Sequence, residues 1–495
     1  FDGGGVGDND AVSAAFNELR TSGSANHGGY WSIQSVSSDE MAVTQKGSDW
    51  YDGGIWIDMQ RHTFNQTSGP IKDTWNAQYN ASNTCNDVLA EGTLNANQIA
   101  QVKVLRAFFY YRLLDLYGRI KLVTTPGVDV AQSTRAEAFA FVESELLSAL
   151  GIANVSNLST DLIVSPLEVT MNGYRINQFA ALGLLAKLYL NAEVYAGVAK
   201  YAEAEIAAGY VIDNGGYTLC DTGCSVPNAG KRPAVASDPE TLEGYAAVFA
   251  PNNQNNPEII WAIAFDNLTG KGMNFAQMTL HYTSQFTWNL AAQPWNGYSV
   301  LEDFYNSYDA ADKRKKANFI IGKQSDYLGG QLIDFSGQEG KLDLEYIPEI
   351  DQLAPNSDRD GGARLGKFSF RQGQQPDMDN DMPIIRLGEM YLIRAEAKAR
   401  VAGDWSLAAT DVNTIRARAG LPAMTNITAD SFLAERGREM FMEVTRRQDL
   451  IRFGKWGSSW WEKTNSDAYR IVFPIPQSQI DASTGIGKLS QNPGY

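Results

Sequence analysis

The sequence predicts a mainly α-helical fold in which helix pairs form a scaffold, long irregular loops connect the pairs, and a few short strands complete it. Several segments repeat apolar residues every three or four positions, which is the period of an amphipathic helix. Other segments, such as the one containing "NNQNNP", show neither that period nor the alternation of a strand. With 44% hydrophobic residues in a chain of 495, the protein can also bury a substantial core.

The clearest predicted helix covers residues 95–118. Its apolar side chains at helical spacing are Ile99, Val102, Leu105, Phe109, Leu113 and Leu116. Residues 71–92 are predicted to form a second helix just before it. The core-facing side chains expected on that helix are Trp75, Tyr79 and Val88.

Two further helix pairs are predicted at residues 175–208 and 385–420, and one more helix at 430–453. In the 385–420 pair, the turn holds Gly403 and Asp404, the second helix starts at Trp405, and Ala408 marks the close contact. This arrangement resembles the tetratricopeptide unit, in which a tight turn and small alanines let two helices pack closely.

Long irregular segments interrupt these pairs, so the sequence does not predict a simple solenoid. They lie at about residues 20–70, 209–260, 266–300 and 320–384. Loops of this length inside a compact protein are usually functional or disordered.

The formal net charge of −16 argues against nucleic acid as a partner, because binding to a phosphate backbone needs a basic face. No run of about 18 apolar residues is present, so no membrane span is expected. The chain starts at "FDGGGVGDND" without Met. We interpret this start as a chain whose leader and anchor have been removed; a cytosolic protein is the alternative.

The three cysteines do not form a metal-site pattern. Cys220 and Cys224 lie in a loop rich in Gly, Pro and Asn, where a disulfide is slightly favoured over two free thiols. A disulfide there would close a very short loop and stabilise the fold little. Cys85 lies in a helical pattern and is expected to be a small core residue.

Motifs for catalysis or cofactor binding are weak throughout the chain. None of the three histidines pairs with another at metal-ligand spacing, and no G-x-S-x-G elbow is present. "GARLGKF" near residue 366 lacks the Ser or Thr of a phosphate loop, and "DMDND" at 377–381 lacks the Gly and Glu of a calcium loop. We therefore predict no catalytic residues, no metal and no cofactor, although 57 acidic residues leave a glycosidase pair open.

Two irregular segments carry tryptophans among amides and charged residues, which suits the binding of sugars. Sugar rings stack their C–H faces on aromatic rings, and their hydroxyls bond to amides and carboxylates. The candidate glycan-binding residues are Trp288, Trp295 and Tyr298 in one segment, and Asp49, Trp50, Arg61 and Asn65 in the other. Loop packing is an equally good explanation for any one of these tryptophans. Trp75 and Trp405 are interpreted as core residues, and Trp456, Trp460 and Trp461 as packing residues.

Several segments, in order along the chain, resemble the SusD/RagB family of surface glycan-binding lipoproteins of Bacteroidetes. The resemblance covers about residues 37–495. The matching segments are "SSDEM", "TWNAQYNASNTCNDVL", "VLRAFFYYRLLDLYGRIKLV", "NNPEIIWAIAF", "MPIIRLGEMYLIRAEAKAR", "VNTIRARAGLP", "ERGREMFMEVTRRQDLIRFG", "FPIPQSQI" and "QNPGY". The chain departs from the family at Val444, where Gly is common after the Glu, and we expect only a local packing change there.

The resemblance implies one SusD-like domain over residues 1–495, with an N-terminal part to about 210 and a C-terminal part from about 211. It implies four tetratricopeptide-like helix pairs and a less regular half that supplies much of the glycan site. It also implies a lipid-anchored location at the outer membrane, facing the cell exterior, although no lipidation Cys is present in this chain. The implied partner is a SusC-type TonB-dependent transporter, to which the protein delivers oligosaccharide.

The family's glycan site commonly draws on an early loop and on a loop past mid-chain, which are the two segments chosen above from composition. A neutral β-glucan such as laminarin is the specific glycan that we expect, since flat stacking on Trp suits neutral glucose polymers. Two alternatives remain open: a glycoside hydrolase with a helical fold, and a tetratricopeptide-like scaffold that binds peptides. Retardation in polysaccharide gels without release of reducing sugar distinguishes glycan capture from both.

Overall fold

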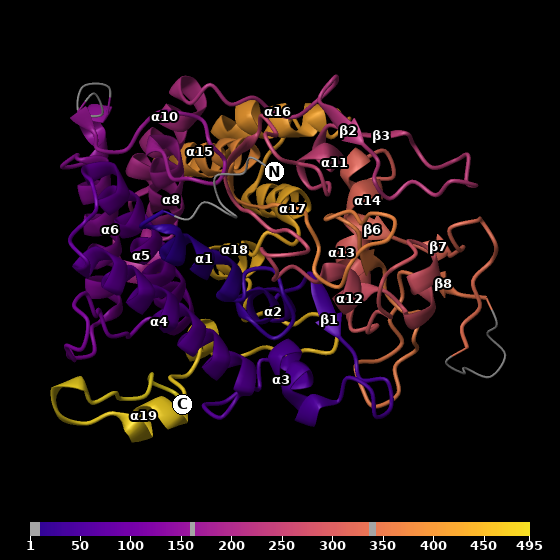
Figure 1. Ribbon diagram of the computed structural model, residues 1–495, viewed down its shortest axis with the longest axis horizontal. Coiled ribbons are helices and arrows are strands. Elements are labelled where there is room, and N and C mark those ends of the chain that lie inside the picture. The colour runs from indigo at the N-terminus through magenta and orange to yellow at the C-terminus, as the bar shows by residue number, and fades with distance from the viewer. Residues whose placement is uncertain (1–9, 159–163, 336–342) are drawn as a thin grey trace.

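The computed structural model describes residues 10–158, 164–335 and 343–495. Long helices fill one half of the molecule, and the other half consists of loops, short helices and short strands (Figure 1). The prediction of a mainly helical scaffold with irregular insertions is therefore confirmed.

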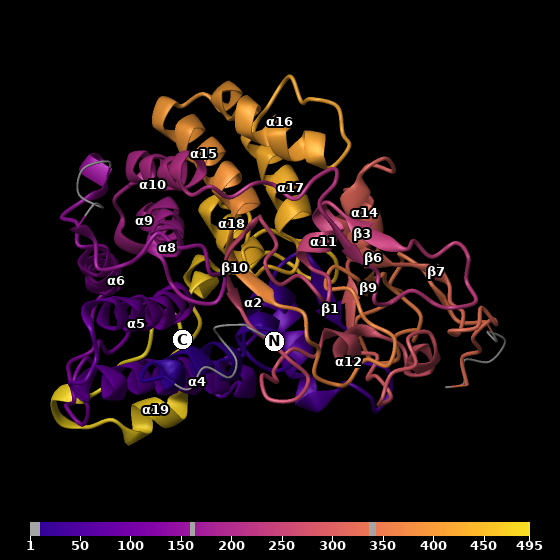
Figure 2. The same cartoon turned by 45° about the horizontal axis from the view of Figure 1, so that its top comes forward.

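The long helices form a row in which each helix packs against the next. In order, the row is α1 (Ser13–Thr21), α4 (Gly69–Ala90), α5 (Ala96–Tyr117), α6 (Arg135–Leu150), α8 (Gln178–Leu190), α10 (Tyr201–Asn214), α15 (Leu387–Ala402) and α16 (Ala409–Arg418). The contact between α10 and α15 joins helices that are far apart in the sequence, so the repeats are contiguous in space (Figure 2). Capping boxes at Asn95 and Thr134 satisfy the free N–H groups that start α5 and α6.

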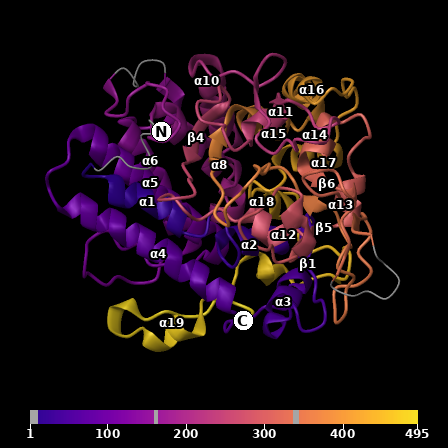
Figure 3. The same cartoon turned by 45° about the vertical axis from the view of Figure 1, so that its right-hand side comes forward.

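Shorter helices surround this row. They are α2 (Tyr30–Val36), α3 (Ile55–Arg61), α9 (Ala192–Ala196), α11 (Tyr245–Val248), α12 (Phe275–Thr279), α13 (Glu302–Asn306), α14 (Lys313–Asn318), α17 (Ala429–Met440), α18 (Arg446–Arg452) and α19 (Gln477–Ala482). The chain's last helix, α19, lies along α4 (Figure 3), where Gln479 donates a hydrogen bond to Asn76.

The described strands pair as two-stranded antiparallel sheets. The pairs are β1 (Met41–Val43) with β5 (Tyr298–Val300), β4 (Ile259–Ile263) with β10 (Met382–Arg386), β2 (Ser225–Pro227) with β3 (Thr241–Glu243), β6 (Phe319–Ile320) with β9 (Arg364–Leu365), and β7 (Gly322–Lys323) with β8 (Glu345–Tyr346). In the first pair, Val43 lies opposite Tyr298. This pairing holds the early aromatic segment beside the aromatic segment past mid-chain.

Three predictions of local structure were wrong. The single helix predicted at 430–453 is two helices, because the backbone adopts the left-handed conformation at Met442 and Val444. Ile99, placed in the core by its spacing, is 37% exposed because it lies in the first turn of α5, near the end of the row. The segment predicted to be irregular at 20–70 contains α2 and α3.

The sequence also predicted that no stretch of the chain could span a membrane, and one segment does not fit this prediction. Arg135–Asn157 is long and apolar enough to cross a membrane by length and composition, with a mean hydropathy of 1.4. In the fold this segment contains α6, which packs against α5 and α8 within the helix row. The side chains of α6 that are buried there are Ala138, Phe139, Val142, Leu146, Ala149 and Leu150.

The predictions for cysteine and tryptophan packing are confirmed. Cys220 and Cys224 form a disulfide, and Cys85 is a free, buried thiol. Trp75 and Trp456 are buried. Trp405 packs on the core formed by α15, α16 and α17, and Trp460 and Trp461 pack partly buried against the main core. The first residues, from which we inferred a removed leader, lie outside the described part of the chain.

A buried ionic network ties α14, α16 and α17 to strands β4 and β10. Arg386, at the end of β10, contacts Glu258, Glu439 and Glu443 at 2.7–2.8 Å. Glu439 also pairs with Arg418 and with Arg314. These side chains are at most about 3% exposed, and the three guanidinium groups hold the pKa of Glu439 well below its usual range. Buried charges persist only when paired in this way.

The turn between α17 and α18 aims a carboxylate into this network. Met442 and Val444 both have positive φ, and Glu443 between them contacts Lys367 and Arg386. Val is unusual in the left-handed region, and such residues cost about 1–3 kcal/mol. The departure from the family pattern therefore falls at a strained position, where glycine would adopt the same backbone without strain.

We predict that Glu439→Gln destabilises the protein by about 3–5 kcal/mol, because it leaves buried guanidinium groups without their shared carboxylate. Chemical denaturation at neutral pH measures the change. Glu91→Gln, at an exposed position that ends α4, is the matched control and should leave stability unchanged. A loss below about 1 kcal/mol for Glu439→Gln would contradict the role given to the network.

We predict that Glu40→Gln makes the protein more stable than the wild type at alkaline pH. Burial raises the pKa of Glu40 to about 8. Between the unfolded value of about 4.3 and 8, the folded state keeps a proton that the unfolded state releases, so stability falls as pH rises through this window. The variant mimics the protonated form and should gain on the order of 3 kcal/mol over wild type at pH 8.5 but little at pH 4.5. A gain that does not change with pH would contradict this assignment.

Candidate functional site

Two aromatic segments meet where β1 pairs with β5. The indole N–H of Trp50 donates a hydrogen bond to the backbone oxygen of Trp295 over 2.6 Å. The Trp50 ring also lies flat against Gly297, where an added Cβ would come within 2.3 Å of the ring. Trp50 is 9% exposed, whereas Trp295 is 38% exposed. The buried Trp50 thus holds the backbone of an accessible Trp295.

His27 lies at the centre of this aromatic cluster. Its ring centroid is 5.0 Å from Trp50, 5.3 Å from Trp56 and 6.1 Å from Trp295. Its Nδ1 is 2.9 Å from the Tyr298 hydroxyl, and burial lowers the pKa of the imidazole. A neutral, hydrogen-bonded imidazole fixes the orientation of the surrounding rings.

The polar edge of the cluster is formed by Asp49 and Tyr282. The Tyr282 hydroxyl donates to the Asp49 carboxylate, and burial together with this partner raises the pKa of Tyr282 to about 12. Asp49 is exposed and Tyr282 is half-buried. We call Trp295, Asp49 and Tyr282, together with the buried Trp50 beside them, the Trp295 surface.

Backbone strain is concentrated in the two segments that build this surface. Trp50, Asp52 and Asn296 have positive φ although none is glycine. Asn296 is held there by hydrogen bonds to the Arg359 backbone oxygen and from the Arg364 guanidinium. Strained residues of this kind persist where the surroundings fix them, often at binding sites.

Three of the predicted site residues, besides Trp288, are not part of the Trp295 surface. Tyr298 is fully buried on β5, where its hydroxyl contacts Ser32 and His27, so its ring supports the cluster from below and is not exposed to a ligand. Arg61 pairs with Glu462 near the C-terminal segment. The Asn65 side-chain oxygen accepts hydrogen bonds from Thr67 and so caps a local turn. Among the described residues, no hydrogen bond or ion pair joins Arg61 or Asn65 to Trp50, Trp295 or Tyr282, so the opposite wall stays a prediction.

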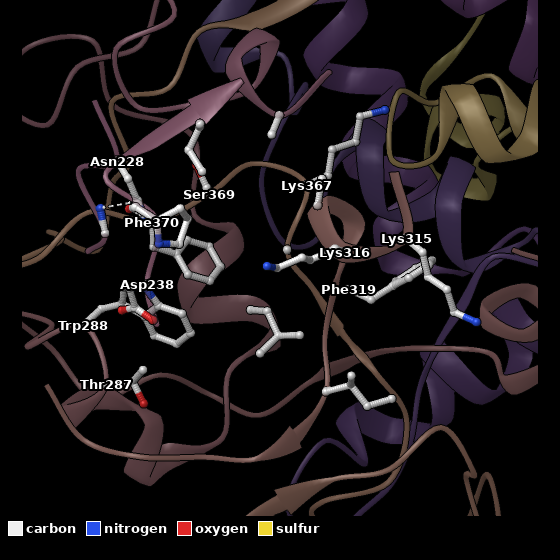
Figure 4. A pocket seen from close by; sticks show the side chains of 18 of the residues that line it. Asn228, Asp238, Thr287, Trp288, Lys315, Lys316, Phe319, Lys367, Ser369 and Phe370 are labelled. Carbon is white, nitrogen blue, oxygen red and sulfur yellow. Dashed lines mark hydrogen bonds between the residues drawn. The ribbon is translucent and has the colours of Figure 1, made fainter. Parts of the chain in front are cut away.

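Trp288 lies in a separate cavity. Its ring meets that of Phe370 edge-on, with 5.1 Å between centroids. The cavity has a volume of about 620 Å³ and lies between the loop at 228–242, α14 with β6, and residues 366–370 (Figure 4). We call it the Trp288 pocket. Among the described residues, no ring contact or hydrogen bond joins Trp288 to Trp50 or Trp295.

The other two histidines have partners within the described part of the chain. His62 stacks on Trp456, and burial lowers its pKa to about 2. His281 is fully buried beside Asp334. No group of three or more His, Cys, Asp or Glu side chains that could hold a metal occurs among the described residues.

The two sequence motifs set aside above have structural roles. Lys367 of "GARLGKF" is buried against Glu443. In "DMDND", Asp377 accepts from the Gly272 amide, Asp379 pairs with Arg371, and Asp381 bonds to Tyr174. The ammonium group of the first motif and the carboxylates of the second therefore already have partners within the protein.

Sequence reasoning found Trp50, Trp295 and Asp49 but missed His27, Tyr282 and Gly297. His27 lies in a segment with no periodicity or motif, and Tyr282 is one of several aromatic residues in its segment. Glycine at 297 is recognisable only once the Trp50 ring is seen against it. These contacts depend on the pairing of β1 with β5. Strands this short leave too little pattern in a sequence to predict that pairing.

A family model described as the SusD family matches residues 247–470. The starch-binding protein SusD of Bacteroides thetaiotaomicron is 26% identical over 447 residues, which cover 80% of this chain and 73% of that protein. A solved laminarin binding SusD-like protein superimposes with a TM-score of 0.70 at 21% identity, covering 98% of both chains. Surface glycan-binding protein A from Bacteroides thetaiotaomicron, solved with laminarihexaose, has a TM-score of 0.73 at 22% identity, covering 97% of this chain and 98% of that one.

We predict that Gly297→Ala displaces the Trp50 ring, because its Cβ would overlap that ring. Near-ultraviolet circular dichroism and tryptophan fluorescence should change, and the variant should lose about 1–3 kcal/mol of stability, as overpacked sites do. Gly69→Ala is the control, since nothing lies within 4 Å of its added Cβ. Spectra identical to wild type would show that Trp50 does not lie against Gly297 in solution.

Proposed function

Because the chain belongs to the SusD family, we propose that it captures a polysaccharide or oligosaccharide at the Trp295 surface without cleaving it. The observation that carries this proposal is the exposed Trp295, whose backbone is fixed by a hydrogen bond from the buried Trp50 indole. An exposed aromatic face fixed in this way offers a stacking platform to a sugar ring at little cost in side-chain entropy.

The polar edge of the Trp295 surface suits the hydroxyls of a sugar. The exposed Asp49 carboxylate has acceptor sites beyond the one that Tyr282 occupies. Millimolar affinity needs only about −4 kcal/mol. One stacked ring and a few hydrogen bonds at roughly 1 kcal/mol net each reach that range.

We propose that the glycan is a neutral β-glucan such as laminarin. Two similar solved structures are named for laminarin or contain laminarihexaose, and the curated relative is named for starch, so glucose polymers recur among them. The net charge of −16 disfavours a polyanionic chain over the surface as a whole.

We further propose that the protein acts at the cell surface, on an outer membrane, through an N-terminal lipid anchor. There it would pass its glycan to a SusC-type TonB-dependent transporter. The support for location, anchor and partner is membership of the family. A pull-down of the transporter from outer-membrane extracts with the full-length lipidated protein tests the pairing.

Capture and hydrolysis make opposite predictions for the bound glycan. The described histidines are buried or engaged, and similar proteins are named for binding a glycan. We therefore expect laminarin to be retained unchanged. Release of reducing sugar during prolonged incubation would favour the hydrolase alternative.

We predict that Trp295→Ala weakens laminarin binding at least about tenfold, which corresponds to roughly 1.4 kcal/mol, because the stacking face is removed. Isothermal titration calorimetry and affinity gels measure the loss, and the unfolding midpoint should stay close to wild type. Trp288→Ala is the matched control: it removes a half-buried tryptophan of the same segment that lies in the other cavity. Unchanged laminarin affinity in a folded Trp295→Ala variant would contradict the proposed site.

A further inference from the structure

The Trp288 pocket contains two hydroxyls without partners. Thr287 is 4% exposed, and its Oγ1 has no hydrogen bond to any described residue. The same holds for the buried Oγ of Ser369. Both residues line the pocket (Figure 4). Buried polar atoms are nearly always satisfied, so two unsatisfied hydroxyls on one cavity indicate that a ligand or ordered water completes them.

One cation of the pocket is free to meet an anion. Lys316, exposed on α14, forms no ion pair or hydrogen bond with the described residues. In Figure 4 its ammonium group points toward the side of the cavity that holds Trp288 and Phe370, whereas those of Lys315 and Lys367 point away. Lys316 therefore presents an uncompensated positive charge at the aromatic wall.

Most of the other charges of the pocket are paired within the protein. Arg232 pairs with Asp238, Asp312 with Arg314, Lys323 with Asp343 and Lys367 with Glu443. The Lys315 ammonium keeps its charge and donates to the Tyr308 backbone oxygen. The pocket is thus locally positive in a chain of net charge −16. A volume of about 620 Å³ is within the usual range for a small-molecule site.

We propose that the Trp288 pocket is a second carbohydrate site, which takes a sugar unit carrying a carboxylate. The carboxylate pairs with the Lys316 ammonium, the sugar ring lies on the Trp288 and Phe370 wall, and its hydroxyls bond to Thr287 and Ser369. The site is separate from the Trp295 surface and does not depend on the capture of a neutral glucan there.

The test compares a short β-1,4-linked oligoglucuronate with its carboxyl-reduced form, a cello-oligosaccharide of the same length. The two ligands differ only in carboxylate against hydroxymethyl. We expect the full chain to bind the oligoglucuronate at least about tenfold more tightly in low salt, with the preference falling as salt rises, because one ion pair carries it. Lys316→Gln should abolish the preference and leave laminarin affinity unchanged, while Lys315→Gln should change neither.

The unpartnered hydroxyls give an independent test. Thr287→Val and Ser369→Ala should weaken oligoglucuronate binding several-fold without lowering the unfolding midpoint, since neither hydroxyl has a partner inside the protein to lose. Equal affinity of wild type for the two ligands, or an undiminished preference in Lys316→Gln, overturns the proposal. The effect of Trp295→Ala on laminarin binding tests only the Trp295 surface. A failure of that proposal can therefore be told apart from a failure of the proposal for the Trp288 pocket.

Discussion

The antiparallel pairing of β1 with β5 is the constraint on which the candidate site depends. It sets Val43 opposite Tyr298, so the Trp50 and Trp295 segments meet although they are about 245 residues apart in the chain. The strands are only three residues long, and the aromatic cluster around His27 supplies the packing that such a short ladder lacks. Strand pairing fixes the position of the rings, and the rings in turn bury the strands. The accessible Trp295 face follows from this mutual support.

The buried ionic network likewise fixes the relative positions of elements in the helical half. Arg386 on β10, Glu439 on α17 and Arg418 on α16 contact Glu258 and Arg314, which lie in the long insertion between α10 and α15. Such a network is not a strong source of net stability, since apolar residues of the same volume would serve as well or better. Its main contribution is to position these elements, because each charged group must lie beside its partners. The disulfide loop is joined to it, since the Cys220 amide donates to Glu258.

Much of the scaffold could be predicted from sequence, and the site only in part. The helix at 95–118 is recognisable from its apolar period, whereas α6 was not predicted. The break at Met442 and Val444 leaves no glycine or proline as a signal. Composition identified Trp50 and Trp295 because indole rings among amides and acids are unusual in irregular segments. It could not separate them from Trp288, nor show that Tyr298 is buried, because the face to which a loop side chain turns depends on distant packing. Arg61 and Asn65 share a segment with Trp50, but α3 carries them toward the C-terminal residues.

The two tryptophans of residues 281–300 thus serve two surfaces with different chemistry. One is an open, neutral stacking face beside a carboxylate, and the other is a cavity with a free ammonium group. A crystal structure of the protein with laminarihexaose would show whether Trp295 is the platform for a neutral glucan. We expect an intact ligand with a glucose ring stacked on the Trp295 face. A ligand bound away from Trp295, or one found cleaved, would rule out this role for Trp295.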